Sequence, residues 1–276
     1  MIVLRVTVNL NAPEGGRKLK VVILCGGLGT RLREETEFRP KPMINIGPRP
    51  VLWHIMKLYA YHGFDEFILC LGYKGEMIKD YFYHYEVMNS DVTLKLGYPD
   101  RTVLHHSLDE KGWKVTLTDT GKNALKGARL KRVEKYVPDD VFMMTYGDGV
   151  ADVDIRALLK FHISHGKIAT VTGVNAFSRF GELKIRGDDI VSFSEKPQNA
   201  TDLINGGFFV FNKEIFDYVK NDDDCDFEYG ALERIASEGQ LKVYKHPGAW
   251  ACMDTARDMD YLNALWNENR AFWKVW

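Results

Sequence analysis

A glycine-rich segment carries the strongest chemical signal in the sequence. It runs Gly26-Gly27-Leu28-Gly29-Thr30-Arg31 and directly follows the apolar run 20–24. Glycines let the backbone bring its N–H groups against a phosphate or a planar base, and Arg31 adds a fixed cationic fork. Ligands of parallel sheets bind beyond the carboxyl ends of the strands, so this position favours a nucleotide site. A tight turn between a strand and a helix is the alternative.

Two standard phosphate-binding motifs do not fit this loop. No Lys-Ser or Lys-Thr pair follows the glycines, which excludes a P-loop. Leu32 stands where a dinucleotide-binding loop would carry its third glycine, and no acidic residue ends the second expected strand near Cys70. An NAD-dependent oxidoreductase is therefore disfavoured.

A lysine between two prolines follows about ten residues later, in the segment Arg39-Pro40-Lys41-Pro42-Met43. Each proline fixes its own φ and restricts the residue before it, so Lys41 has few backbone options. A lysine held in this way suits a site where a point charge meets a phosphate. A solvated loop lysine is the alternative.

Two aspartates far apart in the sequence could hold a metal ion. Asp148 lies between Gly147 and Gly149, just after the apolar run 141–146. Hard carboxylate oxygens suit Mg²⁺, which takes one or two carboxylates and substrate phosphates while it keeps several waters. Asp254 precedes the last expected helix, and a simple helix-capping role would also explain it. A turn-stabilising role is the alternative for Asp148.

Two further segments offer groups that could bind a sugar phosphate. Lys196 could contact its phosphate and Glu195 its hydroxyls, since both end an expected strand before a stiffening proline. Asn205 and Gly206 precede the apolar run 208–211, where a ligand could approach the backbone closely.

The elements that must position these groups alternate between strands and helices. Apolar runs predict buried strands at 20–24, 64–71, 141–146, 168–174 and 208–211, with a late strand at 241–245. Helical spacing predicts helices at 51–61, 74–82, 154–165 and 255–268. Residues 183–194 form a hairpin signal, and about 85–135 reads as less regular. The pattern predicts an α/β fold with a mainly parallel central sheet flanked by helices and a smaller mixed C-terminal part.

Composition places the chain among ordinary globular proteins. Its 276 residues are 45% hydrophobic, and 37 Lys and Arg against 38 Asp and Glu give a net charge of −1. This balance argues against a dedicated binder of nucleic acid or of an anionic membrane, and no apolar run approaches a membrane span. The four cysteines form no CxxC pair, so neither a zinc ribbon nor a thioredoxin motif fits. The first residues lack the apolar region of a secretory signal, and we therefore expect a reduced, cytoplasmic protein. We interpret residues 1–18 as an N-terminal extension and 19–276 as one domain.

Together these motifs resemble the sugar-1-phosphate nucleotidyltransferase family. The glycine loop, Lys-Pro-Met, the Gly-Asp after a central strand, Glu-Lys-Pro and the late Asp occur in the family's order, from about Leu19 to Trp276. Other stretches are similar to the branch that uses CTP and glucose 1-phosphate, namely 52–57, 72–75, 129–133, 145–152, 204–210 and 273–276. Residues 124–129 depart from the family's usual pattern, a small hydroxyl residue followed by Thr-Gly-Gly-Arg.

The resemblance implies a Rossmann-like nucleotidyltransferase fold and Mg²⁺-dependent transfer of the cytidylyl group of CTP to α-D-glucose 1-phosphate, with release of pyrophosphate. The product, CDP-glucose, would supply CDP-linked dideoxy sugars such as those of O-antigen. The resemblance also implies a homo-oligomer, such as a hexamer. The same reaction with UTP or dTTP, and a non-catalytic sugar-nucleotide sensor, are the alternatives.

The resemblance also assigns roles to residues. Nucleotide binding falls to Leu24, Cys25, Gly26, Gly27, Leu28, Gly29, Thr30, Arg31, Lys41, Ala124, Arg129 and Gly147. Asp148 and Asp254 would hold the metal, and Arg31, Lys41 and Asp148 are the expected catalytic residues. Glu195, Lys196, Asn205 and Gly206 are the expected sugar-phosphate residues.

Overall fold

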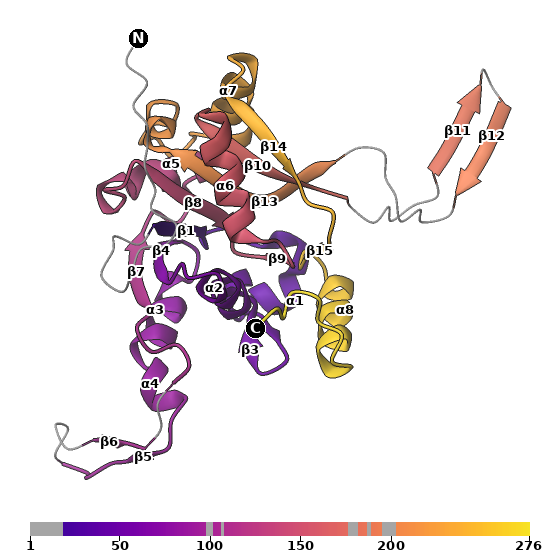
Figure 1. Ribbon diagram of the computed structural model, residues 1–276. Coiled ribbons are helices and arrows are strands. Elements are labelled where there is room, and N and C mark those ends of the chain that lie inside the picture. The colour runs from indigo at the N-terminus through magenta and orange to yellow at the C-terminus, as the bar shows by residue number, and fades with distance from the viewer. Residues whose placement is uncertain (1–18, 98–101, 106–107, 176–181, 187–188, 195–202) are drawn as a thin grey trace.

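A seven-stranded sheet forms the centre of the molecule. The computed structural model describes residues 19–97, 102–105, 108–175, 182–186, 189–194 and 203–276. The strand order is β14-β10-β13-β8-β1-β4-β7 (Figure 1). The strands are β1 (Lys20–Leu24), β4 (Glu66–Leu71), β7 (Lys114–Asp119), β8 (Val141–Tyr146), β10 (Ala169–Val174), β13 (Ile204–Asn212) and β14 (Leu241–Lys245). β13 pairs antiparallel with β8 and β10, and the other neighbours pair parallel. The predicted α/β fold with a mainly parallel sheet is therefore confirmed.

Helices cover both faces of this sheet (Figure 1), and the described residues also form four separate two-stranded ribbons. The helices are α1 (Arg33–Thr36), α2 (Val51–Tyr61), α3 (Gly75–Tyr83), α4 (Tyr85–Met88), α5 (Lys126–Arg132), α6 (Ile155–His165), α7 (Glu233–Ser237) and α8 (Ala256–Asn267). The ribbons pair β2 (Asn45–Ile46) with β3 (Arg49–Pro50), β5 (Val92–Thr93) with β6 (Val103–Leu104), β9 (Gly149–Ala151) with β15 (Trp250–Cys252), and β11 (Glu182–Arg186) with β12 (Asp189–Ser194). None of the described helices has the length and apolar character that crossing a membrane requires.

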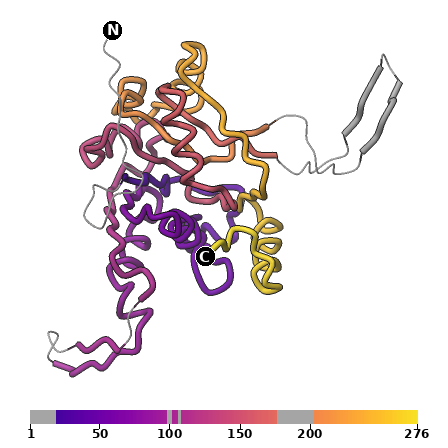
Figure 2. The backbone as a smooth tube through the Cα atoms, viewed as in Figure 1, coloured from indigo at the N-terminus to yellow at the C-terminus, as the bar shows by residue number. Residues whose placement is uncertain are grey.

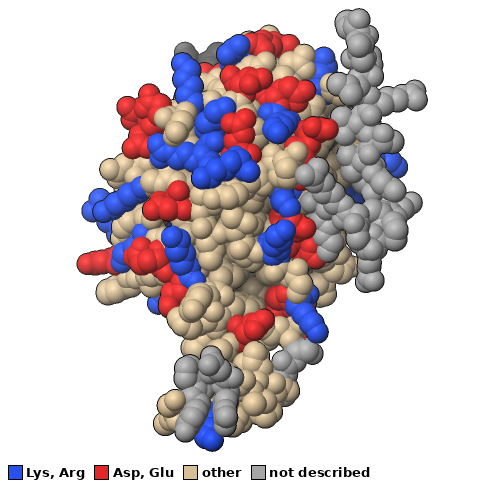
Figure 3. All heavy atoms as spheres, turned by 90° about the vertical axis from the view of Figure 1, so that its left-hand side faces the viewer, with Lys and Arg blue, Asp and Glu red and all other residues tan. Residues whose placement is uncertain are grey.

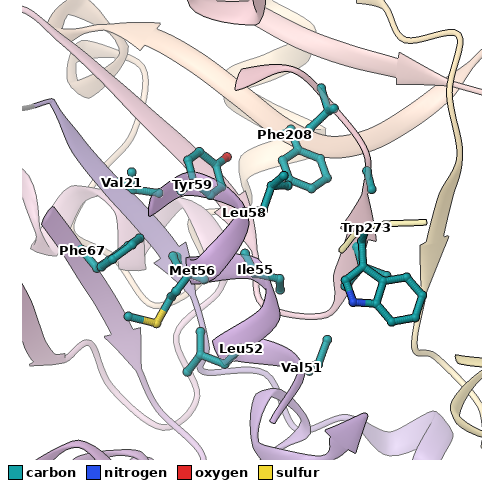
Figure 4. Packing of buried hydrophobic residues seen from close by; sticks show 14 of the residues in the cluster. Val21, Val51, Leu52, Ile55, Met56, Leu58, Tyr59, Phe67, Phe208 and Trp273 are labelled. Carbon is teal, nitrogen blue, oxygen red and sulfur yellow. The ribbon is translucent and has the colours of Figure 1, made fainter. Parts of the chain in front are cut away.

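Side chains of the central strands alternate between two hydrophobic clusters, one on each face of the sheet. In β1, Val21 and Ile23 point to one cluster, and Val22 and Leu24 to the other. The first cluster contains the inner face of α2, which packs against Val21, Phe67, Phe208 and Trp273 (Figure 4). Burial on both faces explains why these strands are continuous apolar runs. Each fully buried large aliphatic or aromatic side chain contributes about 1.5–3 kcal/mol.

The order of the strands creates a switch point beside β1. The chain passes from β1 to β4 and β7 on one side, and then returns to β8 on the other side of β1. In open α/β sheets the crevice outside the carboxyl ends of such strands is the usual ligand site. Here the glycine loop follows β1, and the Gly147-Asp148 pair follows β8.

The region 85–135 was expected to be less regular, and for its second half this expectation is wrong. It contains the edge strand β7 and the helix α5. The sequence of β7, KVTLTD, is polar because an edge strand is only partly buried, and α5 is short and contains Gly127. The expected extension 1–18 lies outside the described residues, so that interpretation and the single domain 19–276 stay predictions.

Positive and negative side chains are interspersed over the molecular face shown in Figure 3. Where its residues are described, that face carries no broad patch of one sign. This distribution agrees with the net charge of −1, and it is unlike the basic surface of a nucleic-acid-binding protein.

Candidate active site

One lysine lies between two carboxylates at the switch point. The Nζ atom of Lys41 is 2.6 Å from Oδ2 of Asp148 and 2.6 Å from Oδ1 of Asp254. Because both carboxylate oxygens contact the same Nζ atom, the distance between them cannot exceed the sum of these two distances. Arg31 completes the cluster, since its guanidinium is 2.8 Å from the other oxygen of Asp254. The structure thus brings together the four side chains that the sequence singled out as catalytic or metal-binding.

A small antiparallel ribbon brings the two aspartates together. β9 follows Asp148 directly and pairs with β15, with Gly149 opposite Cys252. The backbone N–H of Met253 also donates to the carbonyl of Asp148 at 2.9 Å. This pairing carries Asp254 from the C-terminal part of the chain to the end of β8.

The capping role considered for Asp254 is wrong. Thr255 is the N-cap of α8, and its hydroxyl accepts from the backbone N–H of Asp258. The Asp258 carboxylate accepts in return from the N–H of Thr255, which completes a capping box. The side chain of Asp254 is therefore available to the Lys41 cluster.

The charges of this cluster stabilise one another. Burial lowers the pKa of Lys41, but the carboxylates of Asp148 and Asp254 outweigh it, so the pKa lies above its ordinary value. Burial raises the pKa of Asp254, yet Lys41 and Arg31 bring it below its usual range. Lys41 and Asp254 are consequently both charged at neutral pH.

A buried histidine anchors the loop that carries Lys41. The ring of His54 receives the indole N–H of Trp273 at Nδ1, 3.3 Å away, so Nε2 carries the proton and donates to the carbonyl of Ile46 at 2.9 Å. Nearby, the N–H of Gly47 donates to the Asn263 side chain of α8. Figure 2 shows this helix, in yellow, beside the indigo N-terminal part of the chain. The contacts join the Lys41 loop to the helix that follows Asp254.

Arg129 holds the glycine loop in place through hydrogen bonds. Its guanidinium is buried and donates to the carbonyls of Gly26, Leu71 and Gly121 at 2.9, 3.1 and 2.7 Å, and to the Thr120 hydroxyl at 2.9 Å. A Cβ on Gly26 would lie 2.1 Å from this guanidinium. Glycine is therefore required at position 26 by the arginine, whatever the ligand.

Gly147 marks a second close approach of backbone segments. A Cβ there would lie 2.8 Å from the carbonyl oxygen of Leu24, to which the N–H of Gly147 donates at 3.1 Å. The ends of β1 and β8 can meet only because this residue has no side chain.

A cavity of about 450 Å³ opens at these strand ends. Its lining includes most of the predicted nucleotide and metal residues, namely Leu24, Cys25, Gly26, Gly27, Arg31, Lys41, Ala124, Arg129, Gly147, Asp148 and Asp254, and also Gly206. Leu28, Gly29, Thr30 and Asn205 are not part of the lining. Glu195 and Lys196 lie outside the described residues. The roles of all these residues stay predictions.

Sequence reasoning missed several groups that line the cavity. They are Lys126, Tyr146, Asp226, Trp250 and Cys252. Lys126 lies between Ala124 and Arg129, two of the predicted nucleotide residues, and this position was the available signal. Tyr146 ends the predicted strand 141–146, and its position at the carboxyl end was the available signal.

The donor groups at the cluster suit a hard cation. Within the described ranges, no group of three or more His, Cys, Asp or Glu side chains gathers as a metal-binding set. Asp148 and Asp254 supply two carboxylates, which matches Mg²⁺ because that ion takes one or two carboxylates and completes its shell with water and substrate phosphates.

Comparisons with known proteins assign this arrangement to a family. The model of a family described as nucleotidyl transferase matches residues 20–270. The chain belongs to the nucleotidyl transferase family. It is 51% identical to the glucose-1-phosphate cytidylyltransferase of Salmonella typhimurium over 259 residues, which cover 94% of this chain and 100% of that relative. The resemblance predicted from the motifs is thus confirmed.

Other members of this family differ in the nucleotide that their names state. The chain is 30% identical to the D-glycero-alpha-D-manno-heptose 1-phosphate guanylyltransferase of Campylobacter jejuni, over 90% of this chain and 100% of that relative. The solved inositol-1-phosphate CTP transferase from T. maritima superposes with a TM-score of 0.64 at 16% identity, covering 94% of this chain and 98% of that one. This second likeness shows the shared fold alone.

We predict that Arg129→Lys destabilises the protein by about 2–4 kcal/mol, because a lysine cannot satisfy all the carbonyls that the guanidinium binds. Arg132→Lys in the same helix is the matched control, since Arg132 is more exposed and should lose no more than about 1 kcal/mol. Urea unfolding measures both. Equal losses would contradict the bracing role of Arg129.

We also predict a pH effect from His54. Burial lowers the pKa of His54 from 6.5 to about 4. The unfolded chain therefore binds more protons between these values, and stability falls as the pH drops from about 6.5 to 4, by on the order of 3 kcal/mol. His54→Gln should be less stable at pH 7 but lose less stability between pH 7 and 4.5. Thermal unfolding at several pH values measures this, and parallel curves for the two proteins would refute it.

Proposed function

We propose that this protein transfers the cytidylyl group of CTP to α-D-glucose 1-phosphate and releases pyrophosphate. The observation that carries the proposal is the convergence of Asp148 and Asp254 on Lys41 beside the glycine loop. The choice of CTP and glucose 1-phosphate is supported by the 51% identity to the Salmonella typhimurium cytidylyltransferase over that relative's whole length.

Each side of the cavity has an expected ligand in this proposal. The nucleotide binds over Gly26, Gly27 and the wall that includes Ala124, while Lys41 and Arg31 contact its phosphates. Gly206 lies at the start of β13 and lines the same cavity, so the sugar phosphate binds on that side. Glu195, Lys196 and Asn205 are proposed to hold the sugar and its phosphate there.

The reaction needs little activation of the sugar phosphate. Its second pKa is near 6, so an anionic oxygen is already present at neutral pH and can attack the α-phosphorus in line. Pyrophosphate leaves, and no covalent enzyme intermediate is needed. The main obstacle is the repulsion of two polyanions, about 4 kcal/mol per pair of unit charges at 4 Å and an effective dielectric of 20. Lys41 and Arg31 offset this repulsion and hold the reacting groups in line.

Asp148 and Asp254 would hold Mg²⁺ in this site. When bound, the ion neutralises charge on the substrate phosphates. Lys41 contacts both carboxylates in the structure. We infer that its ammonium turns toward the phosphates when the metal and the nucleotide are present.

The same chemistry with UTP or dTTP is the nearest alternative, since relatives of this fold use several nucleotides by name. A non-catalytic sensor of sugar nucleotides is less well supported. A sensor has no need of a paired carboxylate site, and both Asp148 and Asp254 are present and converge.

We further infer a cytoplasmic homo-oligomer, for which a hexamer is one arrangement, that supplies CDP-linked sugar synthesis. All four cysteines are free thiols, as a reducing compartment requires. Large apolar side chains lie exposed at the ends of α3 and α4 and in the turn after β5, including Tyr83, Met88 and Leu96 at 85%, 77% and 88% exposure. Such a surface favours protein contacts, and sedimentation equilibrium measures the mass of the assembly.

We predict that Asp148→Asn lowers kcat at least about a hundredfold, the scale of losing one main electrostatic contact. Binding of Mn²⁺, followed by electron paramagnetic resonance, should weaken in the same variant. Asp154→Asn is the matched control, because an asparagine can still cap α6 and Asp154 lies away from the cluster. An unchanged kcat in Asp148→Asn would refute the metal assignment.

The function is tested by a panel of CTP, UTP, GTP and dTTP with glucose 1-phosphate, with pyrophosphate release as the readout. We expect kcat/KM for CTP to exceed the others by at least about tenfold, a difference of 1.4 kcal/mol. Higher activity with UTP or dTTP would support the alternative nucleotide. Binding of a nucleotide without any pyrophosphate release would support the sensor.

A further inference from the structure

The cavity contains one cationic side chain that neither the metal cluster nor the scaffold uses. Among the described residues that line it, the cations are Arg31, Lys41, Lys126 and Arg129. Arg31 and Lys41 bind the two aspartates, and Arg129 is bound to backbone carbonyls. Lys126 lies at the start of α5, in the same wall as Ala124.

Lys126 is held at the cavity wall by two contacts. Its ammonium lies 4.7 Å from the centre of the Tyr146 ring, and it forms an ion pair with Glu228. Tyr146 also lines the cavity, whereas Glu228 does not. The ammonium therefore lies between the cavity and a carboxylate behind the wall.

The carboxylate of Glu228 has a second partner. The hydroxyl of Tyr146 donates to its Oε1 at 2.6 Å, and the Asn205 side chain donates to the same hydroxyl at 3.3 Å. Burial, and then the neighbouring carboxylate, raise the pKa of Tyr146, so the phenol stays protonated and keeps donating. Glu228 would thus not be left as an unpaired charge if Lys126 turned away.

An anion in the cavity could therefore replace Glu228 as the partner of the Lys126 ammonium at a small cost in free energy. The Lys126 side chain is 47% exposed and that of Glu228 is 27% exposed, so water screens this ion pair and weakens it. A phosphate oxygen offers the ammonium a charge-assisted hydrogen bond in its place. Both substrates of the proposed reaction bring phosphate into this cavity.

We propose that Lys126 is a substrate-binding residue that exchanges the Glu228 carboxylate for a phosphate group of the bound substrate. The inference rests on the proposed function for the identity of the substrates. The contact between the Lys126 ammonium and a phosphate does not depend on that function. The phosphate could belong to the nucleotide or to the sugar phosphate, and the experiment separates these two sources.

Two variants with opposite expected effects test the exchange. Lys126→Met keeps the side-chain stem without the charge, and we expect it to raise the Kd for a phosphate ligand about tenfold, the scale of one charge-assisted hydrogen bond. Glu228→Gln keeps an oxygen that accepts from Tyr146 but releases Lys126, so the same Kd should fall severalfold. Lys126→Arg should bind nearly as the unaltered protein does. A merely structural ion pair would give losses of binding in both Lys126→Met and Glu228→Gln.

Calorimetric titration measures these Kd values with Mg²⁺ and one ligand at a time, so no turnover occurs. CTP and glucose 1-phosphate are the two arms, and cytidine and glucose are the controls without phosphate. An effect confined to one arm identifies which substrate supplies the phosphate. Thermal unfolding confirms that each variant is folded, and Lys126→Gln replaces Lys126→Met if the latter is not.

Inorganic pyrophosphate is included as a ligand so that this inference can fail separately from the proposed function. If the nucleotide panel shows no preference for CTP while Lys126→Met still weakens pyrophosphate binding, the Lys126 assignment stands and the proposed function does not. Unchanged Kd values in Lys126→Met for CTP, glucose 1-phosphate and pyrophosphate would overturn the Lys126 assignment. So would equal losses in Lys126→Met and Glu228→Gln.

Discussion

The contact of one ammonium with two carboxylates fixes the geometry of the whole site. Lys41 comes from a loop near the N-terminus, Asp148 from the end of β8 and Asp254 from the residue before the capped α8. Partly buried like charges repel, and removing the lysine would leave two carboxylates facing each other with only Arg31 to offset their charge. The fold must therefore hold three distant segments in register, and the β9–β15 ribbon and the His54 anchor both serve this purpose.

Packing within the scaffold accounts for several glycines of the site, independently of any ligand. Gly26 and Gly72 would each place a Cβ within 2.4 Å of the Arg129 guanidinium, and Gly147 would place one against the end of β1. Once Arg129 holds the carbonyls of this loop, the backbone N–H groups have a defined direction. A glycine-rich loop is thus both the product of close backbone packing and the surface that a phosphate can approach.

Local patterns predicted most of the sheet, because its central strands are buried on both faces and stand out as apolar runs. The same reasoning failed for β7 and α5, where partial burial leaves a polar sequence. Asp148 could be predicted as a site residue because it follows the strongest strand. Its pairing with Asp254 was predicted only through the family resemblance, since the contact depends on a ribbon between segments far apart in the sequence, and a helix cap explained the local pattern equally well. The brace formed by Arg129 left no local signal, because its partners are backbone carbonyls.

Three cations of the cavity share one electrostatic arrangement. Lys41 and Arg31 are paired with aspartates, and Lys126 is paired with Glu228. Unpaired cations crowded together would repel one another, and each of these three has a carboxylate partner, whereas Arg129 is bound to backbone carbonyls. Substrate binding then exchanges partners instead of creating or removing charge. Such an exchange requires that the released carboxylate find another partner, which the Tyr146 hydroxyl supplies for Glu228 and a divalent cation would supply for the aspartates. In the proposed function, a preference of the site for phosphates would thus follow from how its carboxylates are satisfied as much as from its positive charges.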